Sequence, residues 1–305
     1  MSILHGVIKK PANLIEVFSA CNFFKINKLI IYAPKYYRVR STKPVKINYK
    51  NYINSFEKKN INFKIEVRKY KNKDQPNLIK KINKKKNIHY LAIYGDQTFS
   101  RILISMKKKI TSIAITDGPL DSLGLINYFI IMKSRNFANY LKIPFYLLIY
   151  NFFKLKYSFS FLKNRKYLFS QETINISNFQ INNSLKKKLL SKRIHTLIIE
   201  DPTMTMSLNE ITKKYKLNRK NFCTIGRKGT FKIGHKIQEN ISILPEVLIN
   251  SGIINKVYVN PISSVCTFAK FKKIKIINLP IRVFHFDGCS RILAKYISNQ
   301  FKKIR

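Results

Sequence analysis

"YLAIYGDQTFSRILISMKKKITSIAIT", residues 90–116, contains the pattern that decides the fold. Its two ends, YLAIY and SIAIT, are short apolar runs rich in β-branched residues, which favour strands. Between them, Asp96 is placed to cap a helix whose apolar residues recur at helical spacing and whose last residues are lysines. The stretch therefore predicts a strand, a helix and a second, parallel strand.

The same alternation continues on both sides of this unit. Residues 121–160 are expected to be mainly helical, and residues 175–188, rich in Asn and Ser, have the composition of a linker. A chain of 305 residues is long enough for two cores, so we expect an α/β protein with domains at 1–180 and 181–305. The other predicted strands are LIIYA (29–33), FKIEV (63–67), IHTLII (194–199), NFCTI (221–225), KVYV (256–259) and IKIIN (274–278).

The charge balance points to an anionic partner. The chain has 59 Lys and Arg against 14 Asp and Glu, a formal net charge of +45. Such an excess attracts phosphate, anionic lipid head groups or acidic glycans, and it does not choose among them. Codon bias in an AT-rich genome, with a solvated lysine surface, is an alternative origin for the same composition.

The cysteines and the N-terminus favour the cytoplasm. Cys21, Cys223, Cys266 and Cys289 are widely spaced, which predicts neither a metal site nor a disulfide framework. The N-terminus has no continuous apolar core of the kind that a signal peptide needs. The longest apolar run, residues 143–153, is too short to cross a bilayer. Its aromatic residues are compatible with a peripheral position on the inner face of the cytoplasmic membrane and equally with a buried helix.

Several of the few acids follow predicted strands, where ligands of parallel sheets bind. Asp117 and Gly118 come directly after SIAIT, and Pro119 prevents the strand from continuing. Asp117 is thus a candidate base for a substrate hydroxyl; the alternative is that it shapes a turn. The acids at or just after predicted strand ends are Asp96, Asp117, Asp121, Glu200 and Asp201.

Two stretches of the second half have phosphate-binding chemistry. In KVYVNPISSVCTF (256–268), Ser263 and Ser264 open a predicted helix, where they suit either a phosphate or the role of N-cap. TIGRKGTFKIGHK (224–236) combines three glycines with four cations, suitable for a diphosphate or a nucleotide monophosphate. Neither stretch is a P-loop or a GxGxxG fingerprint.

The order of YLAIYGDQTFSRIL, SIAITDGPLD and ILPEVLINSGIINKVYVNPISSVCTFA resembles the bacterial sialyltransferase and polysialyltransferase group, over about residues 89–120 and 194–280. This resemblance implies a GT-B fold, in which two Rossmann-like domains face a central cleft. It also implies transfer of a sialic-acid-type sugar from a CMP-activated donor to a glycan or lipid-linked glycan acceptor of the cell surface. No metal ion or other cofactor is then expected.

The resemblance also assigns roles to particular residues. Asp117 matches the second acid of the family's acid-acid-Gly motif, the general base, while Thr116 stands in place of the first acid. Ser263 and Ser264 match the hydroxyl pair that holds the CMP phosphate, and Glu246 matches an acid associated with the donor nucleotide.

The family's His-Pro motif is missing from this chain. TIGRKG stands in its place, so the histidine that stabilises the departing CMP has no direct counterpart. Arg227 falls near the family's arginine after that motif, and His235 is the candidate that titrates near neutral pH. Both are therefore retained as candidate site residues.

Two other functions remain open. The net charge of +45, with 17 Tyr and 22 Phe, suits a nucleic-acid-binding protein that contacts phosphates and stacks on bases. Against this, lysines are spread along the chain and no RRM, KH or zinc-finger signature occurs. A non-catalytic GT-B relative that binds a nucleotide sugar is the second alternative.

Overall fold

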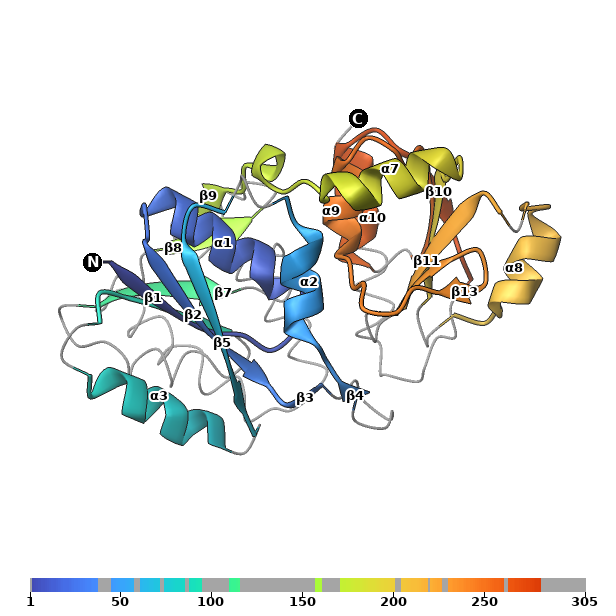
Figure 1. The fold of residues 1–305 in the computed structure, drawn as a ribbon. Coiled ribbons are helices and arrows are strands. Elements are labelled where there is room, and N and C mark those ends of the chain that lie inside the picture. The colour runs from blue at the N-terminus through green and yellow to red at the C-terminus, as the bar shows by residue number, and fades with distance from the viewer. Residues whose placement is uncertain are drawn as a thin grey trace, which may run out of the picture. The chain divides into compact units, whose positions relative to one another are not determined.

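The chain divides into two compact units, Met1–Tyr49 with Ile61–Asn175 and Lys50–Asn60 with Ile176–Arg305 (Figure 1). The second unit thus begins close to residue 181 but also includes a segment from the first half of the chain. The computed structural model describes residues 2–37, 45–57, 61–71, 74–85, 88–94, 110–115, 157–160, 171–200, 204–218, 220–226, 230–260 and 263–280.

Within these residues, the first unit is built on a sheet of seven parallel strands, in the order β5-β2-β1-β6-β7-β8-β9. Counted along the chain, this order begins 3-2-1-4-5-6, as in Rossmann folds, and it reverses between β1 and β6. The strands are β1 (Ile3–Val7), β2 (Lys28–Pro34), β5 (Lys64–Tyr70), β6 (Tyr90–Tyr94), β7 (Thr111–Ile115), β8 (Tyr157–Ser160) and β9 (Gln171–Thr173). A two-stranded ribbon, β3 (Tyr36–Tyr37) and β4 (Val45–Lys46), follows β2.

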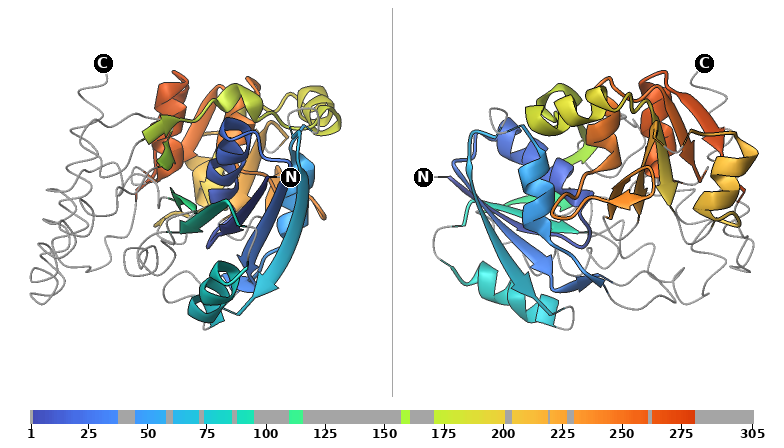
Figure 2. Two further views of the ribbon diagram at one scale, coloured as in Figure 1. Left: turned by 90° about the vertical axis from the view of Figure 1, so that its left-hand side faces the viewer. Right: turned by 45° about the vertical axis from the view of Figure 1, so that its right-hand side comes forward.

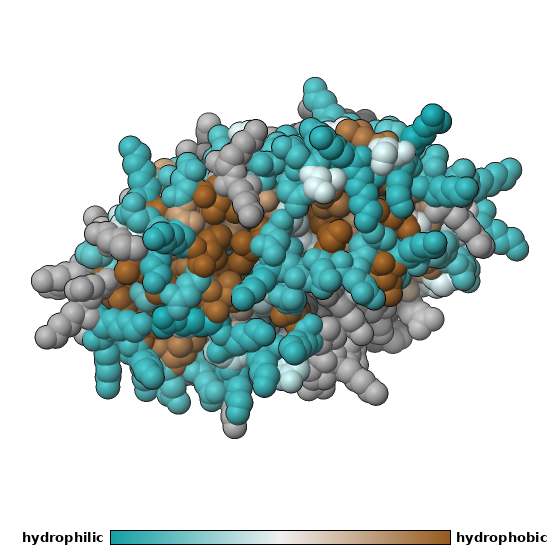
Figure 3. All heavy atoms as spheres, viewed as in Figure 1, coloured by the Kyte–Doolittle hydropathy of each residue, from teal (hydrophilic) through white to brown (hydrophobic). Residues whose placement is uncertain are grey.

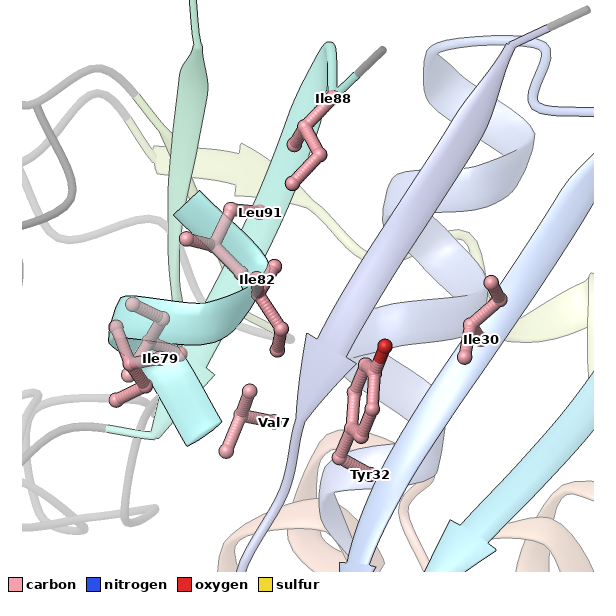
Figure 4. Packing of buried hydrophobic residues seen from close by; sticks show 8 residues of the cluster. Val7, Ile30, Tyr32, Ile79, Ile82, Ile88 and Leu91 are labelled. Atoms are coloured by element: carbon pink, nitrogen blue, oxygen red, sulfur yellow. The ribbon is translucent and has the colours of Figure 1, made fainter. Parts of the chain in front are cut away.

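Helices cover both faces of this sheet (Figure 2). α3 (Gln75–Asn83) packs Ile79 and Ile82 against Val7 and Tyr32 of the strands (Figure 4). α1 (Asn13–Phe23) lies on the opposite face. Gly6 and Val7 are successive residues of β1 and therefore point to opposite faces: Val7 faces α3, and Gly6 faces α1. A Cβ atom at Gly6 would lie 3.1 Å from a methyl group of Val17, so glycine permits the close approach of α1 to β1.

The described strands of the second unit form a mixed sheet in the order β13-β12-β11-β10-β14-β15. The last four are parallel, whereas β12 and β13 form an antiparallel hairpin at one edge. The strands are β10 (Thr196–Glu200), β11 (Phe222–Gly226), β12 (Phe231–Ile233), β13 (Lys236–Ile237), β14 (Lys256–Val259) and β15 (Lys275–Asn278). Both units therefore have the α/β architecture of Rossmann-like folds, and the parallel order of this sheet reverses between β10 and β14.

The helices of the second unit enclose its sheet (Figure 1). α8 (Leu208–Lys214) begins at a capping box formed by Ser207 and Glu210, and it packs Ile211 against Ile198 and Tyr258. α9 (Pro245–Asn250) and α10 (Ser264–Phe271) lie on the other side of the strands, next to each other. The remaining elements are α2 (Tyr49–Ser55), η5 (Ile176–Asn178) and α7 (Asn183–Ser191).

Long-range pairing places residues 50–60 in the second unit. Phe56 forms a β-bridge with Ile181, and its ring contacts the ring of Phe179 at 6.0 Å between centroids. The Asn182 amide donates to the Ser55 carbonyl at 2.9 Å. No local sequence pattern predicts this pairing, because its partners are more than 120 residues apart.

Where the structure describes them, the predicted strands are confirmed with ends within about three residues; the largest shift is at β5, which ends at Tyr70 and not at residue 67. Several other described elements were not expected, among them the β12–β13 hairpin. β1 and α1 were not predicted, and β8 occurs in the region expected to be mainly helical. Residues 175–188 are not a linker: the Asn182 side chain accepts from the Leu185 amide at 2.9 Å and starts α7. The helix predicted between β6 and β7 lies outside the described residues.

His5 is a buried histidine in the middle of β1. Its side chain lies on the α3 side of the sheet, 3% of the residue is exposed, and Nδ1 is 3.1 Å from the Tyr32 hydroxyl. Burial, followed by the charges of Lys85 and Arg68, lowers the pKa of His5 to about 4. The folded protein therefore holds a neutral imidazole there at neutral pH.

This burial predicts a loss of stability in acid. Because the folded pKa lies below the unfolded value of 6.5, the unfolded chain binds the proton first. The free energy of unfolding should be highest above pH 6.5 and fall by about 3 kcal/mol as the pH drops toward 4. Urea unfolding at several pH values should show a weaker dependence for His5→Phe than for wild type. The exposed His89→Phe is the control; an unchanged pH dependence in His5→Phe would contradict the assignment.

Candidate functional site

The carboxyl ends of β10 and β14 mark the candidate site of the second unit. The parallel order of the sheet reverses between these strands, and ligands of open α/β sheets bind beyond the strand ends at such a point. Glu200 is the last residue of β10, and Asn260 directly follows β14. The chain then enters α10, where Ser263 and Ser264 were predicted to lie.

Ser263 is the N-cap of α10. Its Oγ accepts a hydrogen bond from the Val265 amide at 3.3 Å, and its own amide donates to the Asn260 carbonyl at 3.0 Å. This geometry confirms the capping interpretation. It is compatible with phosphate binding too, because a hydroxyl that accepts one hydrogen bond can donate another. Ser264 is the first residue of α10, and its side chain lies outside the described part of the structure.

Lys232 and Glu200 form an ion pair at the carboxyl end of β10, on the face of the sheet that α8 covers. The Lys232 Nζ lies 2.9 Å from Oε1 and 3.1 Å from Oε2 of Glu200. Lys232 comes from β12 and Glu200 from β10, so the contact spans the intervening strand β11. Gly226, the register partner of Glu200 on β11, has no side chain to come between the two groups.

Glu246 lies in the first turn of α9 and is 5% exposed. α9 follows the β12–β13 hairpin and leads to the start of β14, so its first turn is the end nearer the carboxyl edge of the sheet. The family resemblance implies a place for this acid beside the donor nucleotide, and the topology is compatible with that place.

His235 lies at the amino end of the parallel strands, whereas Glu200 and Ser263 lie at their carboxyl end. It follows Gly234 in the β12–β13 turn, where the Gly234 amide donates to the Phe222 carbonyl at 2.8 Å. The ring of His235 is 5.7 Å from the ring of Phe222, the first residue of β11. β12 therefore carries the chain back to the amino end of the parallel strands. The alternation in TFKIGHKI is the pattern that indicates this hairpin.

Asp117 and Arg227 lie outside the described residues. The structure describes the chain up to Ile115, the end of β7, and up to Gly226, the end of β11. Both residues therefore follow carboxyl ends of parallel strands in sequence. The other acids predicted near strand ends, Asp96, Asp121 and Asp201, are also outside the described residues.

The described part of the chain offers few other reactive groups. Cys21, Cys223 and Cys266 are buried, and burial raises the pKa of the Cys21 thiol. No cluster of three His, Cys, Asp or Glu residues suited to a metal ion occurs among the described residues. Nor does any described helix combine the length and apolar character needed to span a bilayer.

Comparison of the chain with protein-family models, with curated proteins and with solved structures finds no match.

Thr224, on β11, has a buried hydroxyl group. It is the register partner of Lys232 and is fully buried. Its Oγ1 has no hydrogen-bond partner among the described residues. A buried hydroxyl without a partner costs about 1–3 kcal/mol.

We therefore expect Thr224→Val to stabilise the protein by about 1 kcal/mol, because valine keeps the shape and removes the hydroxyl. Thr212→Val is the matched control: the Thr212 hydroxyl is also buried but donates to the Asn209 carbonyl at 2.9 Å. The control should destabilise by about 1 kcal/mol. Urea unfolding of both variants checks the prediction, which is wrong if the two variants lose stability equally.

Proposed function

We propose that the chain is a GT-B-type glycosyltransferase that moves a sialic-acid-type sugar from a CMP-activated donor to a glycan acceptor of the cell surface. The position of Ser263 carries this proposal: it precedes α10 at the end of β14, one of the two strands between which the parallel order of the sheet reverses. The Rossmann-like architecture of both units is the second support, and the resemblance of the sequence motifs is the third.

The donor side of the proposed reaction belongs to the second unit. Ser263 and Ser264 would hold the CMP phosphate at the start of α10, where the helix dipole favours an anion. Glu246 would contact the nucleotide, and Arg227 would supply positive charge to the leaving group. His235 is not assigned a role, because the β12–β13 turn lies at the amino end of the parallel strands and Ser263 at the carboxyl end.

The acceptor side belongs to the first unit, with Asp117 as general base. Its carboxylate would take the proton of an acceptor hydroxyl while the hydroxyl oxygen attacks the anomeric carbon. The bond between that carbon and the phosphate oxygen breaks, and CMP leaves with the electron pair. The α10 amides and serine hydroxyls would stabilise the negative charge that develops on the phosphate.

The charge of +45 suits an anionic acceptor glycan or the inner face of the cytoplasmic membrane. On the face seen in Figure 3, hydrophilic side chains are spread over the elements of both units. The lysines are spread along the whole sequence, which favours contact with an extended anionic surface over binding of nucleic acid along a single basic stripe.

Asp117→Ala should reduce sugar transfer about 100-fold or more, because it removes the group that takes the acceptor proton. Affinity for CMP should stay within about twofold, since the base contacts the acceptor rather than the donor. Transfer of labelled sialic acid and calorimetric CMP binding measure the two effects. Asp74→Ala, at the start of α3, is the control. Full activity in Asp117→Ala would remove Asp117 from the base role.

Cytidine nucleotides should stabilise the protein selectively, because a ligand that binds the native state raises the unfolding temperature. A thermal-shift titration with CMP, CDP, UDP, GDP and a short RNA at two salt concentrations checks this. A shift with cytidine nucleotides that survives the higher salt supports the proposal. Stabilisation by RNA alone, lost at the higher salt, would contradict it and favour a nucleic-acid-binding protein.

A further inference from the structure

The Lys232–Glu200 pair is built across a strand of the sheet. Neighbouring strands lie about 4.8 Å apart, so β12 and β10 are separated by about 10 Å. Lys232 extends over this distance, and its Nζ reaches both carboxylate oxygens of Glu200, at 2.9 and 3.1 Å. The ammonium group is thereby held at the end of β10, next to the point where the order of the sheet reverses.

Stability does not account for this arrangement. The Lys232 and Glu200 side chains are 22% and 29% exposed, and partly exposed ion pairs of this kind contribute little to folding. Holding a lysine side chain in one conformation also costs entropy. A function at the ligand-binding edge explains the pair better.

The chemistry of the pair fits an anion. An unpaired carboxylate at this edge would repel a phosphate, and Lys232 cancels that charge. An ammonium group has three N–H donors, of which Glu200 accepts two, so the third is left for a phosphate oxygen. Lysine also serves as a point charge for phosphate in other nucleotide sites.

We propose that Lys232 binds the phosphate of the donor nucleotide and that Glu200 is the positioning residue that holds its ammonium group. This inference rests on the proposed function and narrows the phosphate-binding chemistry expected of residues 224–236 to one cation, Lys232 of the hairpin strand β12.

Calorimetric titration with CMP, UMP and inorganic pyrophosphate tests the proposal. Lys232→Met should weaken CMP and pyrophosphate binding about tenfold, and Lys232→Arg should retain most of the affinity. Lys236→Met is the matched control, because Lys236 is an exposed lysine of the same hairpin that lies at the amino end of the parallel strands, away from Glu200. It should change the affinities less than about twofold.

A second substitution separates charge from structure. In Lys232→Met, the Glu200 carboxylate has lost this ion-pair partner and repels the ligand, so adding Glu200→Gln should recover about threefold of the lost affinity. A merely structural role of the pair predicts no recovery. Absence of any recovery would therefore overturn the assignment, as would equal losses in Lys232→Met and Lys236→Met.

The outcomes distinguish this inference from the proposed function. If wild type binds CMP, UMP and pyrophosphate equally and only Lys232→Met weakens them, Lys232 binds phosphate and the cytidine donor is wrong. If CMP is preferred but Lys232→Met binds it normally, the donor stands and the role of Lys232 is wrong. Wild type that binds none of the three anions overturns both.

Discussion

Parallel hydrogen bonding along both edges of one central strand underlies each unit. β1 pairs with β2 and β6, and β10 pairs with β11 and β14. Parallel strands run in the same direction, so their carboxyl ends all lie at one end of the sheet, and each strand is joined to the next by a crossover connection. The order of each sheet reverses beside its central strand, and the adjacent crossovers therefore separate to opposite sides there. Glu200 at the end of β10 and Ser263 after β14 lie at the same end of the sheet because of this geometry and not because of closeness in the sequence.

Apolar runs with β-branched residues were sufficient to predict most described strands, because burial on both faces imposes that composition. β1 escaped prediction because ILHGV interrupts its apolar run with His5 and Gly6. Its place is decided by pairing with two distant strands and by the close approach of α1, and no short window of sequence contains either. Asn182 misled in another way: a residue typical of linkers is equally typical of the first position of a helix.

The candidate site was predictable in part. The position of Ser263 between β14 and α10 follows from a strand, an Asn-Pro turn and a helix, all visible in the sequence. The Lys232–Glu200 pair was not predictable, because it joins strands 32 residues apart through a hairpin that was itself missed. The same hairpin decides where His235 lies: the sequence shows that it follows a strand, and only the pairing of β12 shows to which end of the sheet the chain returns.

The segment at residues 50–60 has a consequence for how the protein is made. Phe56 and Tyr52 are buried, and the segment hydrogen-bonds to residues around 181. A ribosome adds about 5–20 residues per second, so these aromatic side chains leave it roughly ten seconds before their partners exist. During that time the later strands of the first unit are still being made, and this segment of the second unit has no partner to pack against. The order of synthesis and the order of assembly therefore differ in this chain, and nascent chains of intermediate length expose the aromatic side chains of Tyr52 and Phe56, which the finished protein buries.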